Sequence, residues 1–146
     1  MKIIKLLFDL IRQHKRHRMK NFQDLFDVCR RYLADGEDSI SIGSLYVEIT
    51  PKERDENGVS IRITVNSAVM VQNGGIMVRQ SLFSPDSMNI YSHRKGGCLV
   101  YLYEEKDRQV HRCKFGMNAS LKNLKKVFKN RHVNYIVNQL MSYGEA

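Results

Sequence analysis

Apolar and polar residues alternate along the middle of the chain. Residues 45–50 and residues 59–65 both follow this pattern, which is typical of strands with one buried face and one solvated face. The charged segment between them ends in Asn57-Gly58, a pair that adopts the positive φ angles needed for a return turn. The two runs therefore predict a hairpin with a long loop.

A second hairpin is predicted around Asn73-Gly74-Gly75, which separates residues 68–72 from residues 76–80. Asparagine followed by glycine favours the tight turns that match the twist of paired strands. Three consecutive apolar residues flank the turn on each side. Such runs predict strands that are covered on both faces.

Turn residues divide the rest of the strand-rich region. Pro85, within residues 84–87, predicts a turn because proline presets its φ angle and has no amide hydrogen for a sheet. A short strand is expected at 88–93. The next segment, Arg94-Lys95-Gly96-Gly97, has two open interpretations: a plain hairpin turn, or a small turn whose amides bind an anion.

A third strand pair, residues 98–104 and 110–115, is expected to turn through residues 105–109. Residues 39–42 add an edge strand or the start of the first strand. Together these runs predict one antiparallel sheet of about five to seven strands, within the usual size range.

Helices are predicted before the sheet. Residues 1–13 place apolar side chains on one side and charged ones on the other, and a basic block follows at 14–20. The block leaves three interpretations open: a core helix with a solvated tail, a nucleic-acid arm, or a membrane-surface helix. A second helix should begin after Asn21, with Asp24 completing a capping box, and should end at Gly36.

Two helices are also predicted after the sheet. Ser120 is expected to cap a helix that buries Leu121, Leu124, Val127 and Phe128. A second apolar stripe covers residues 133–141, rotated by about a third of a turn from the first at 100° per residue. One straight helix cannot bury both stripes, so a break is predicted at 130–132.

The predicted fold is therefore α+β, a single domain over residues 1–146. It has a basic amphipathic N-terminal helix and arm at 1–20, a sheet at 39–115, and basic C-terminal helices at 120–143. One hydrophobic core suffices for a chain of 146 residues.

The net charge of +9 is unevenly distributed. Residues 1–20 carry +6, residues 21–107 carry −4, and residues 108–146 carry +7. Two basic segments far apart in sequence can converge on one face and attract phosphate. The alternative is that they are separate solvated surfaces that serve solubility.

From this distribution we predict a non-catalytic protein that binds a polyanion, RNA or single-stranded nucleic acid before duplex DNA. The candidate phosphate-binding residues lie in the two basic segments; they are Arg12, Lys15, Arg16, Arg18, Lys20, Lys122, Lys125, Lys126, Lys129 and Arg131.

Four tyrosines bear on this prediction. Tyr101 and Tyr103 share one face of a predicted strand, and Tyr46 and Tyr91 lie on two others. On an exposed sheet face such rings stack on bases. The alternative is that they fill the core with their hydroxyls at its edge.

Two other partners remain open. One is an anionic membrane surface, bound by the amphipathic N-terminus of a peripheral or matrix-like assembly protein. The other is an acidic protein surface, bound by an inhibitor or adaptor of the phage or virus accessory type. Self-association is compatible with each.

The remaining motifs give little support for catalysis or cofactor binding. Neither a P-loop nor a dinucleotide fingerprint is present, and we expect no cofactor. His14 with His17 and His111 with Cys113 are the candidate zinc ligands, with Cys29, Cys98 and His132 elsewhere. The first pair lies in a basic block, where neighbouring cations oppose a metal ion, so a zinc site is not expected. His111 and Cys113 share a strand face, but no third group orients them as a catalytic pair.

Three scattered cysteines, Cys29, Cys98 and Cys113, do not resemble a disulfide scaffold and fit a reducing compartment. Asp9 interrupts the apolar N-terminal run, so a signal peptide is not expected. We expect a cytoplasmic or nuclear protein, or one held at a membrane surface.

Overall fold

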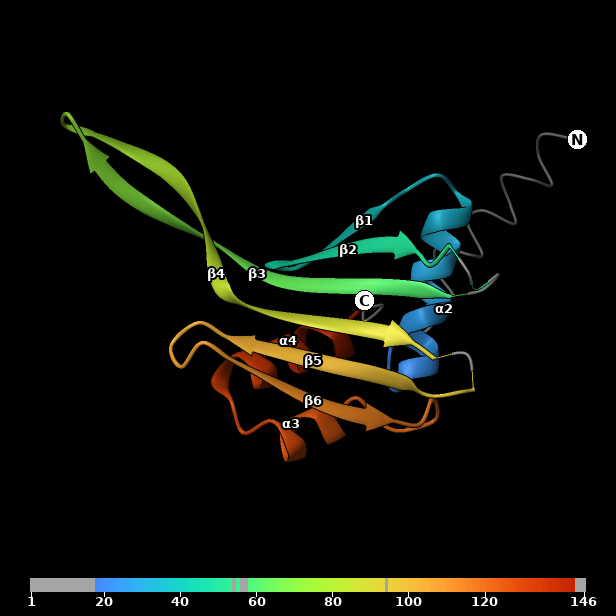
Figure 1. The fold of residues 1–146 in the computed structure, drawn as a ribbon. Coiled ribbons are helices and arrows are strands. Elements are labelled where there is room, and N and C mark those ends of the chain that lie inside the picture. Colours follow the sequence, from blue (N-terminus) through green and yellow to red (C-terminus); the bar gives the residue numbers. More distant parts are fainter. Residues whose placement is uncertain (1–17, 54, 56–57, 94, 144–146) are drawn as a thin grey trace, which may run out of the picture.

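The computed structural model describes residues 18–53, 55, 58–93 and 95–143. Within them, six strands form one antiparallel sheet in the order β1-β2-β3-β4-β5-β6, so each strand pairs with the next one in the chain (Figure 1). The strands are β1 (Ser39–Ile42), β2 (Leu45–Pro51), β3 (Val59–Asn73), β4 (Ile76–Ser92), β5 (Cys98–Glu104) and β6 (Gln109–Phe115). The predicted α+β class and the antiparallel sheet are confirmed.

The helices are α2 (Phe22–Ala34), α3 (Asn123–Val127) and α4 (Arg131–Met141). The structure thus describes one helix before the sheet, where two were predicted. The other predicted helix, at residues 1–13, lies outside the described residues. The predicted break between the C-terminal helices is confirmed, because α3 ends at Val127 and the Asn130 side chain caps α4 by accepting from the His132 amide at 2.7 Å.

Helix α2 begins as predicted. The Asn21 side chain accepts a hydrogen bond from the Asp24 amide at 2.8 Å, and the Asp24 carboxylate accepts from the Asn21 amide at 3.3 Å. This capping box satisfies amides that would otherwise lack a partner at the helix start. Gly36 adopts φ +84° just after the helix, which explains the end near the predicted position.

Helix α3 is shorter than predicted. It begins at Asn123, with Lys122 at its N-cap, and the Ser120 hydroxyl accepts from the Lys122 amide in the preceding turn. Ser120 is therefore not the helix cap. Leu121, Leu124 and Phe128 are buried as expected, whereas Val127 is 48% exposed. A helix this short buries one narrow stripe, and Val127 falls outside it.

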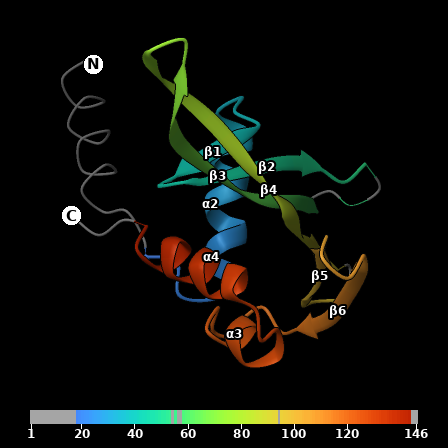
Figure 2. The ribbon, with the colours of Figure 1, turned by 90° about the vertical axis from the view of Figure 1, so that its left-hand side faces the viewer.

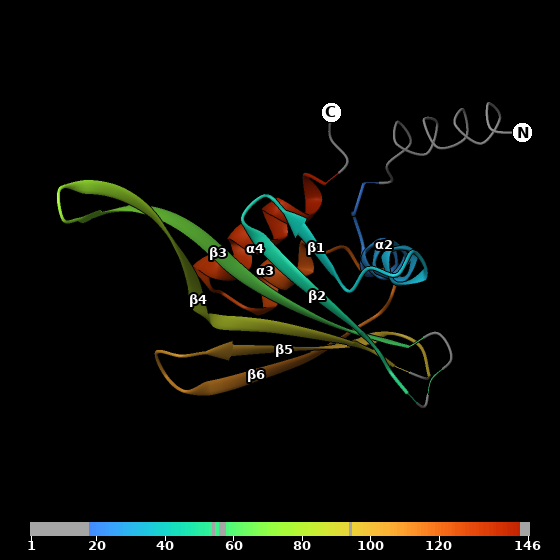
Figure 3. The same ribbon diagram turned by 90° about the horizontal axis from the view of Figure 1, so that it is seen from above.

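The sheet has one covered face and one open face. In β1, β2, β5 and the parts of β3 and β4 outside the arm, alternate residues are buried on the side of the helices. Phe22 of α2 also stacks on Phe115 of β6, with ring centroids 5.0 Å apart. Figure 3 shows the three helices on one side of the sheet. The other face carries polar and aromatic side chains and is met by no helix among the described residues.

The largest departure from the predicted strands is a long two-stranded arm formed by β3 and β4. We predicted a turn at residues 84–87, yet β4 runs through it. The register passes from Thr64↔Ser87 to Asn66↔Phe83, so three residues of β4 face one of β3. This bulge accommodates Pro85, because proline in a strand needs a position without a ladder hydrogen bond.

Beyond the bulge, the arm projects away from the rest of the sheet (Figures 1 and 3). From Asn66↔Phe83 to Asn73↔Ile76 the two strands pair only with each other, since β2 and β5 end their pairing before this point. Ile76 and Met77 are 68% and 57% exposed. The prediction that these strands are covered on both faces is therefore wrong near the turn.

Candidate nucleic-acid interface

The two basic segments meet at the start of α2. The Leu121 amide donates to the Lys20 carbonyl at 2.9 Å, and the Phe22 and Gln23 amides donate to the carbonyls of Ala119 and Met117. Asn21 and Ser120 form an antiparallel bridge. The end of the N-terminal basic segment thus runs alongside the start of the C-terminal one. We call this contact the basic junction, residues 18–20 with residues 119–122.

Apolar anchors hold the junction in place. Met19 is fully buried between the exposed Arg18 and Lys20, and Leu121 is fully buried beside the exposed Lys122. In the extended residues 18–20, burial of Met19 directs Arg18 and Lys20 toward solvent, because consecutive residues point in opposite directions. Lys122 is exposed from the turn that begins with buried Leu121. The charges at the junction are therefore presented outward.

The other predicted residues follow on α3 and α4. Lys126, Lys129 and Arg131 are exposed, and Lys125 is half-buried with its ammonium group donating to the Asn138 side chain of α4. Figure 2 shows α3 and α4 side by side, at the bottom of a view that has the tip of the β3–β4 arm at its top. Arg12, Lys15 and Arg16 lie outside the described residues.

The basic surface has little local neutralisation. The sequence contains no acidic residue between Asp107 and Glu145. The first turn of α4 also lacks one, so the positive end of its dipole is not offset there. Among the described residues, two carboxylates contact the basic surface: Asp24 Oδ2 accepts from the Lys20 amide at 2.9 Å, and Asp86 Oδ2 lies 3.8 Å from His132 Nε2.

The four tyrosines share the open face, where Tyr91 contacts Tyr101 but β3 and β4 separate Tyr46 from Tyr103. The register pairs Tyr101 with Asn89 and Arg112, and Tyr103 with Ser87 and Val110. Tyr46 is 36% exposed, and the other three are half-buried. The expectation that such rings fill the core does not hold for these four.

The basic residues of this face were missed by the sequence prediction. Arg62, Arg112 and Lys114 are exposed on the same side of the sheet as the tyrosines. The alternation of β6 could have revealed two of them, because Arg112 and Lys114 share a strand face opposite to that of His111 and Cys113. The prediction followed charge runs and so overlooked single charges on strands.

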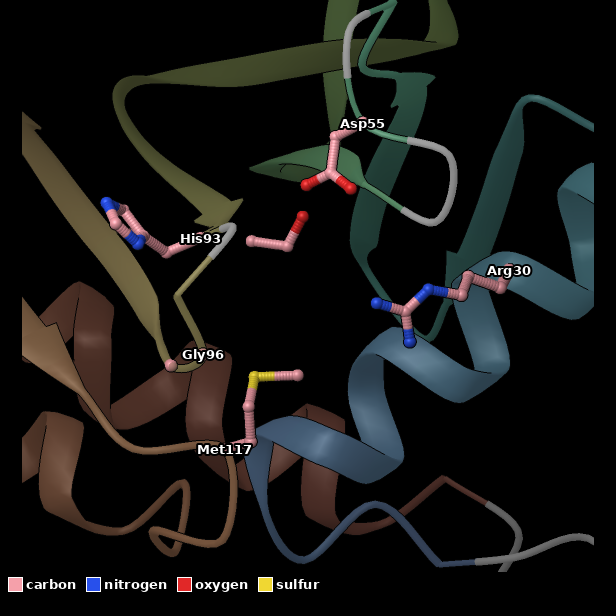
Figure 4. A pocket seen from close by; sticks show the side chains of 7 residues that line it. Arg30, Asp55, His93, Gly96 and Met117 are labelled. Carbon is pink, nitrogen blue, oxygen red and sulfur yellow. The ribbon is translucent and has the colours of Figure 1, made fainter.

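A cavity of about 230 Å³ lies between α2, the β2–β3 connection and the β4–β5 turn, lined by Arg30, Asp55, Ser92, His93, Gly96, Gly97 and Met117. In Figure 4 the Arg30 guanidinium and the Asp55 carboxylate both point into it, whereas the His93 ring points away. A cation and an anion facing one small space do not select a charged ligand of either sign. We therefore do not assign the cavity a ligand.

The described residues Lys95, Gly96 and Gly97 belong to a hairpin turn between β4 and β5, and Arg94 of the predicted segment lies outside the described residues. The Gly96 amide donates to the His93 carbonyl, and the His93 amide donates to the Gly97 carbonyl, both at 3.0 Å. Gly96 and Gly97 adopt positive φ angles of 90° and 78°, which explains the glycine pair. Because the Gly96 amide is already bonded within the turn, the plain hairpin interpretation is the better one.

The residues considered for catalysis have other partners. His111 Nε2 lies 3.5 Å from Glu104 Oε1, and the Cys113 thiol donates to the Lys114 carbonyl at 3.7 Å. Burial raises the pKa of both Cys29 and Cys98 to about 12. Thiols with such pKa values stay protonated near neutrality and are poor nucleophiles.

Among the residues that the structure describes, no group of three His, Cys, Asp or Glu side chains is arranged to hold a metal ion. None of the described helices is long and apolar enough to cross a membrane. Comparison with protein-family models, with curated proteins and with solved structures found no match to this chain.

Proposed function

We propose that the protein binds a polyanion, RNA or single-stranded nucleic acid in preference to duplex DNA, through its basic N- and C-terminal segments. The observation that carries this proposal is the basic junction, where the Leu121 amide bonds the Lys20 carbonyl at 2.9 Å. It joins a segment of net charge +6 to one of +7. Converging like charges raise the local positive potential and attract phosphate groups.

The packing supports a binding role for these lysines. Leu121, Leu124 and Phe128 anchor this segment in the core, so the lysine side chains around them contribute little to burial. Keeping like charges close together costs free energy. A surface that only needed solubility would gain more from mixed charges.

The test is a fluorescence-anisotropy titration of a labelled single-stranded RNA over a range of salt concentrations. If about five phosphates are contacted, log affinity against log salt should slope near −3.5, because each contact on a single strand contributes roughly −0.7. Replacing Lys122, Lys125, Lys126 and Lys129 with Gln should weaken binding and make the slope shallower. Circular dichroism should show that the variant stays folded.

A matched control separates local from overall charge. Lys126→Gln with Lys129→Gln removes two charges from the proposed surface, and Arg31→Gln with Lys95→Gln removes two exposed charges elsewhere. Only the first pair should make the slope shallower. Equal effects would reduce the proposal to non-specific attraction by net charge.

Anionic vesicles test the membrane alternative. A protein that inserts its N-terminal helix should lose vesicle binding on Leu7→Asp, since apolar insertion carries the attachment there. If the wild type binds neither RNA nor vesicles at low salt, the electrostatic proposal fails, and an acidic protein partner becomes the favoured hypothesis.

A further inference from the structure

The open face of the sheet carries a second set of features that suit nucleic acid. Directly paired residues form rows across the strands, and the side chains of every second row point to the same face. The central row joins Glu48, Arg62, Asn89, Tyr101 and Arg112 across β2 to β6. On the same face, the row two residues away on one side contains Tyr91 and Lys114, and the row two residues away on the other side contains Tyr46 and Tyr103.

The rings on this face are held in fixed positions. Tyr91 and Tyr101 meet edge to face, with centroids 5.5 Å apart and planes at 83°. The Tyr103 hydroxyl donates to Glu105 Oε2 at 2.6 Å, and this hydrogen bond raises the pKa of Tyr103. Rings already ordered in the free protein lose little entropy on binding, which favours affinity.

The ring spacing along β5 suits successive bases. Tyr101 and Tyr103 are two residues apart on one strand, which places them roughly 7 Å apart at about 3.4 Å per residue. Bases of an unpaired strand can reach such rings, whereas the bases of a duplex are stacked on one another and hide their faces.

The charges on this face are complementary to a phosphate backbone. Arg62, Arg112 and Lys114 provide three exposed cations. The three rows contain one carboxylate, Glu48, directly opposite Arg62 in the register, and Glu105 beyond the rows accepts from the Tyr103 hydroxyl. Arg112 lies directly opposite Tyr101. Lys114 lies opposite Leu99, two residues along the strands from that pair. A backbone held by Arg112 and Lys114 at the β6 edge would therefore pass beside Tyr101.

We propose that the open sheet face is a base-stacking platform for single-stranded nucleic acid, with Tyr101 and Tyr103 as the stacking residues and Arg112 and Lys114 as phosphate contacts. This inference rests on the proposed function and specifies its substrate class. The basic junction supplies attraction that any polyanion shares, and the platform supplies contacts that require bases. An ordinary cross-strand aromatic cluster, which would only stabilise the sheet, is the competing explanation.

The experiment compares two labelled probes with the same backbone charge. One is a single-stranded oligouridylate of about a dozen nucleotides, and the other is an abasic oligonucleotide of equal length. Tyr101→Leu combined with Tyr103→Leu should weaken oligouridylate binding roughly 5- to 150-fold for each stacked base and leave abasic binding unchanged. Tyr101→Phe with Tyr103→Phe retains the rings and should bind nearly as the wild type does.

Tyrosine fluorescence gives a second measurement. The chain has seven tyrosines and no tryptophan, so its emission comes from tyrosine alone. Oligouridylate should quench part of that emission and the abasic probe should not, and the Leu variant should lose this difference. Tyr135→Leu is the matched control, because Tyr135 is 40% exposed but lies on α4 rather than on the sheet.

The outcomes separate the two proposals. If the Leu variant binds both probes as tightly as the wild type, the platform is refuted while the basic junction can still stand. If the wild type binds neither probe, the proposed function itself fails. Should the Leu variant not fold, Arg112→Gln with Lys114→Gln replaces it. That pair should weaken both probes, and unchanged binding would again refute the platform.

Discussion

The two faces of the sheet are built from the same alternating strands yet carry different residues. The covered face presents Ile63, Ile90 and Val100, each fully buried against the helices. The open face presents tyrosines and single cations that no helix covers among the described residues. Neighbours in one strand, such as Val100 and Tyr101, therefore belong to different environments.

The two faces are expected to contribute differently. The covered face mainly stabilises the fold, and the open face is the proposed binding surface. Burial of apolar side chains on the covered face supplies most of the favourable folding energy. If side chains on the open face vary with small effects on stability, the four large rings there serve a purpose other than folding. The following predictions test this separation, beginning with the largest expected effect.

The two buried thiols, Cys29 and Cys98, should resist labelling. Burial raises the pKa of Cys29 and Cys98 to about 12, so near pH 8 their thiolate fraction is about a thousandfold lower than that of an ordinary thiol of pKa ~8.5. With an aromatic disulfide reagent, Cys113 should react first, and the other two only on unfolding. Rapid reaction of all three in the folded protein would contradict this burial.

The same pKa shift predicts a pH dependence of stability. Below about pH 8.5 these thiols are protonated in both states and contribute no dependence. As the pH rises further, the unfolded thiols ionise while Cys29 and Cys98 stay protonated until about pH 12. The free energy of unfolding should therefore fall over this range, and less steeply in Cys29→Ala than in the wild type.

Truncation in the core of the helical layer should be strongly destabilising. Leu124→Ala and Ile136→Ala should each lower the free energy of unfolding by about 2–5 kcal/mol, because the two side chains are 0% and 2% exposed. Denaturant titration measures this. Val127→Ala on the same short helix as Leu124 is the control, and its 48% exposed side chain predicts a change within about 0.5 kcal/mol.

Loss of the α2 cap should have an intermediate effect. Asn21→Ala removes the acceptor for the Asp24 amide and should cost about 1 kcal/mol. Asn21→Ser supplies another capping oxygen and should recover most of that loss. If Ala and Ser variants melt at the same temperature, the cap is not what stabilises this end of the helix.

The smallest stability change is expected on the open face. Tyr101→Leu should cost less than about 1 kcal/mol, the range for a cross-strand side-chain pair, whereas Val100→Ala next to it opens a cavity in the core and should cost more. Thermal melts of the two variants measure this directly. A Tyr101 effect as large as that of Val100 would mean that these rings are structural.

Local patterns predicted much of this fold because they report short-range physics. Alternation predicted the strands, Asn73-Gly74-Gly75 predicted the arm turn, and Asn21 with Asp24 predicted the capping box, each from side chains or backbone angles close together in the chain. The two rotated apolar stripes predicted the break between α3 and α4. These features needed no knowledge of distant contacts.

The continuous arm was not predictable in the same way. Pro85 favours a turn when only its neighbours are considered. In the structure it lies in a bulge opposite β3, and pairing on either side of the bulge carries β4 through. Whether a proline interrupts a strand or is accommodated depends on the partner strand, which local sequence does not specify.

The sequence by itself determined the α+β class, the alternating strands and the two basic segments, because these depend on periodicity and charge along the chain. Only the tertiary structure decided that Lys20 meets Leu121 and that four tyrosines from three strands share a face with Arg112 and Lys114. Those contacts join residues far apart in sequence. They follow from strand register and from which face the helices cover, and both are set by packing of the whole core.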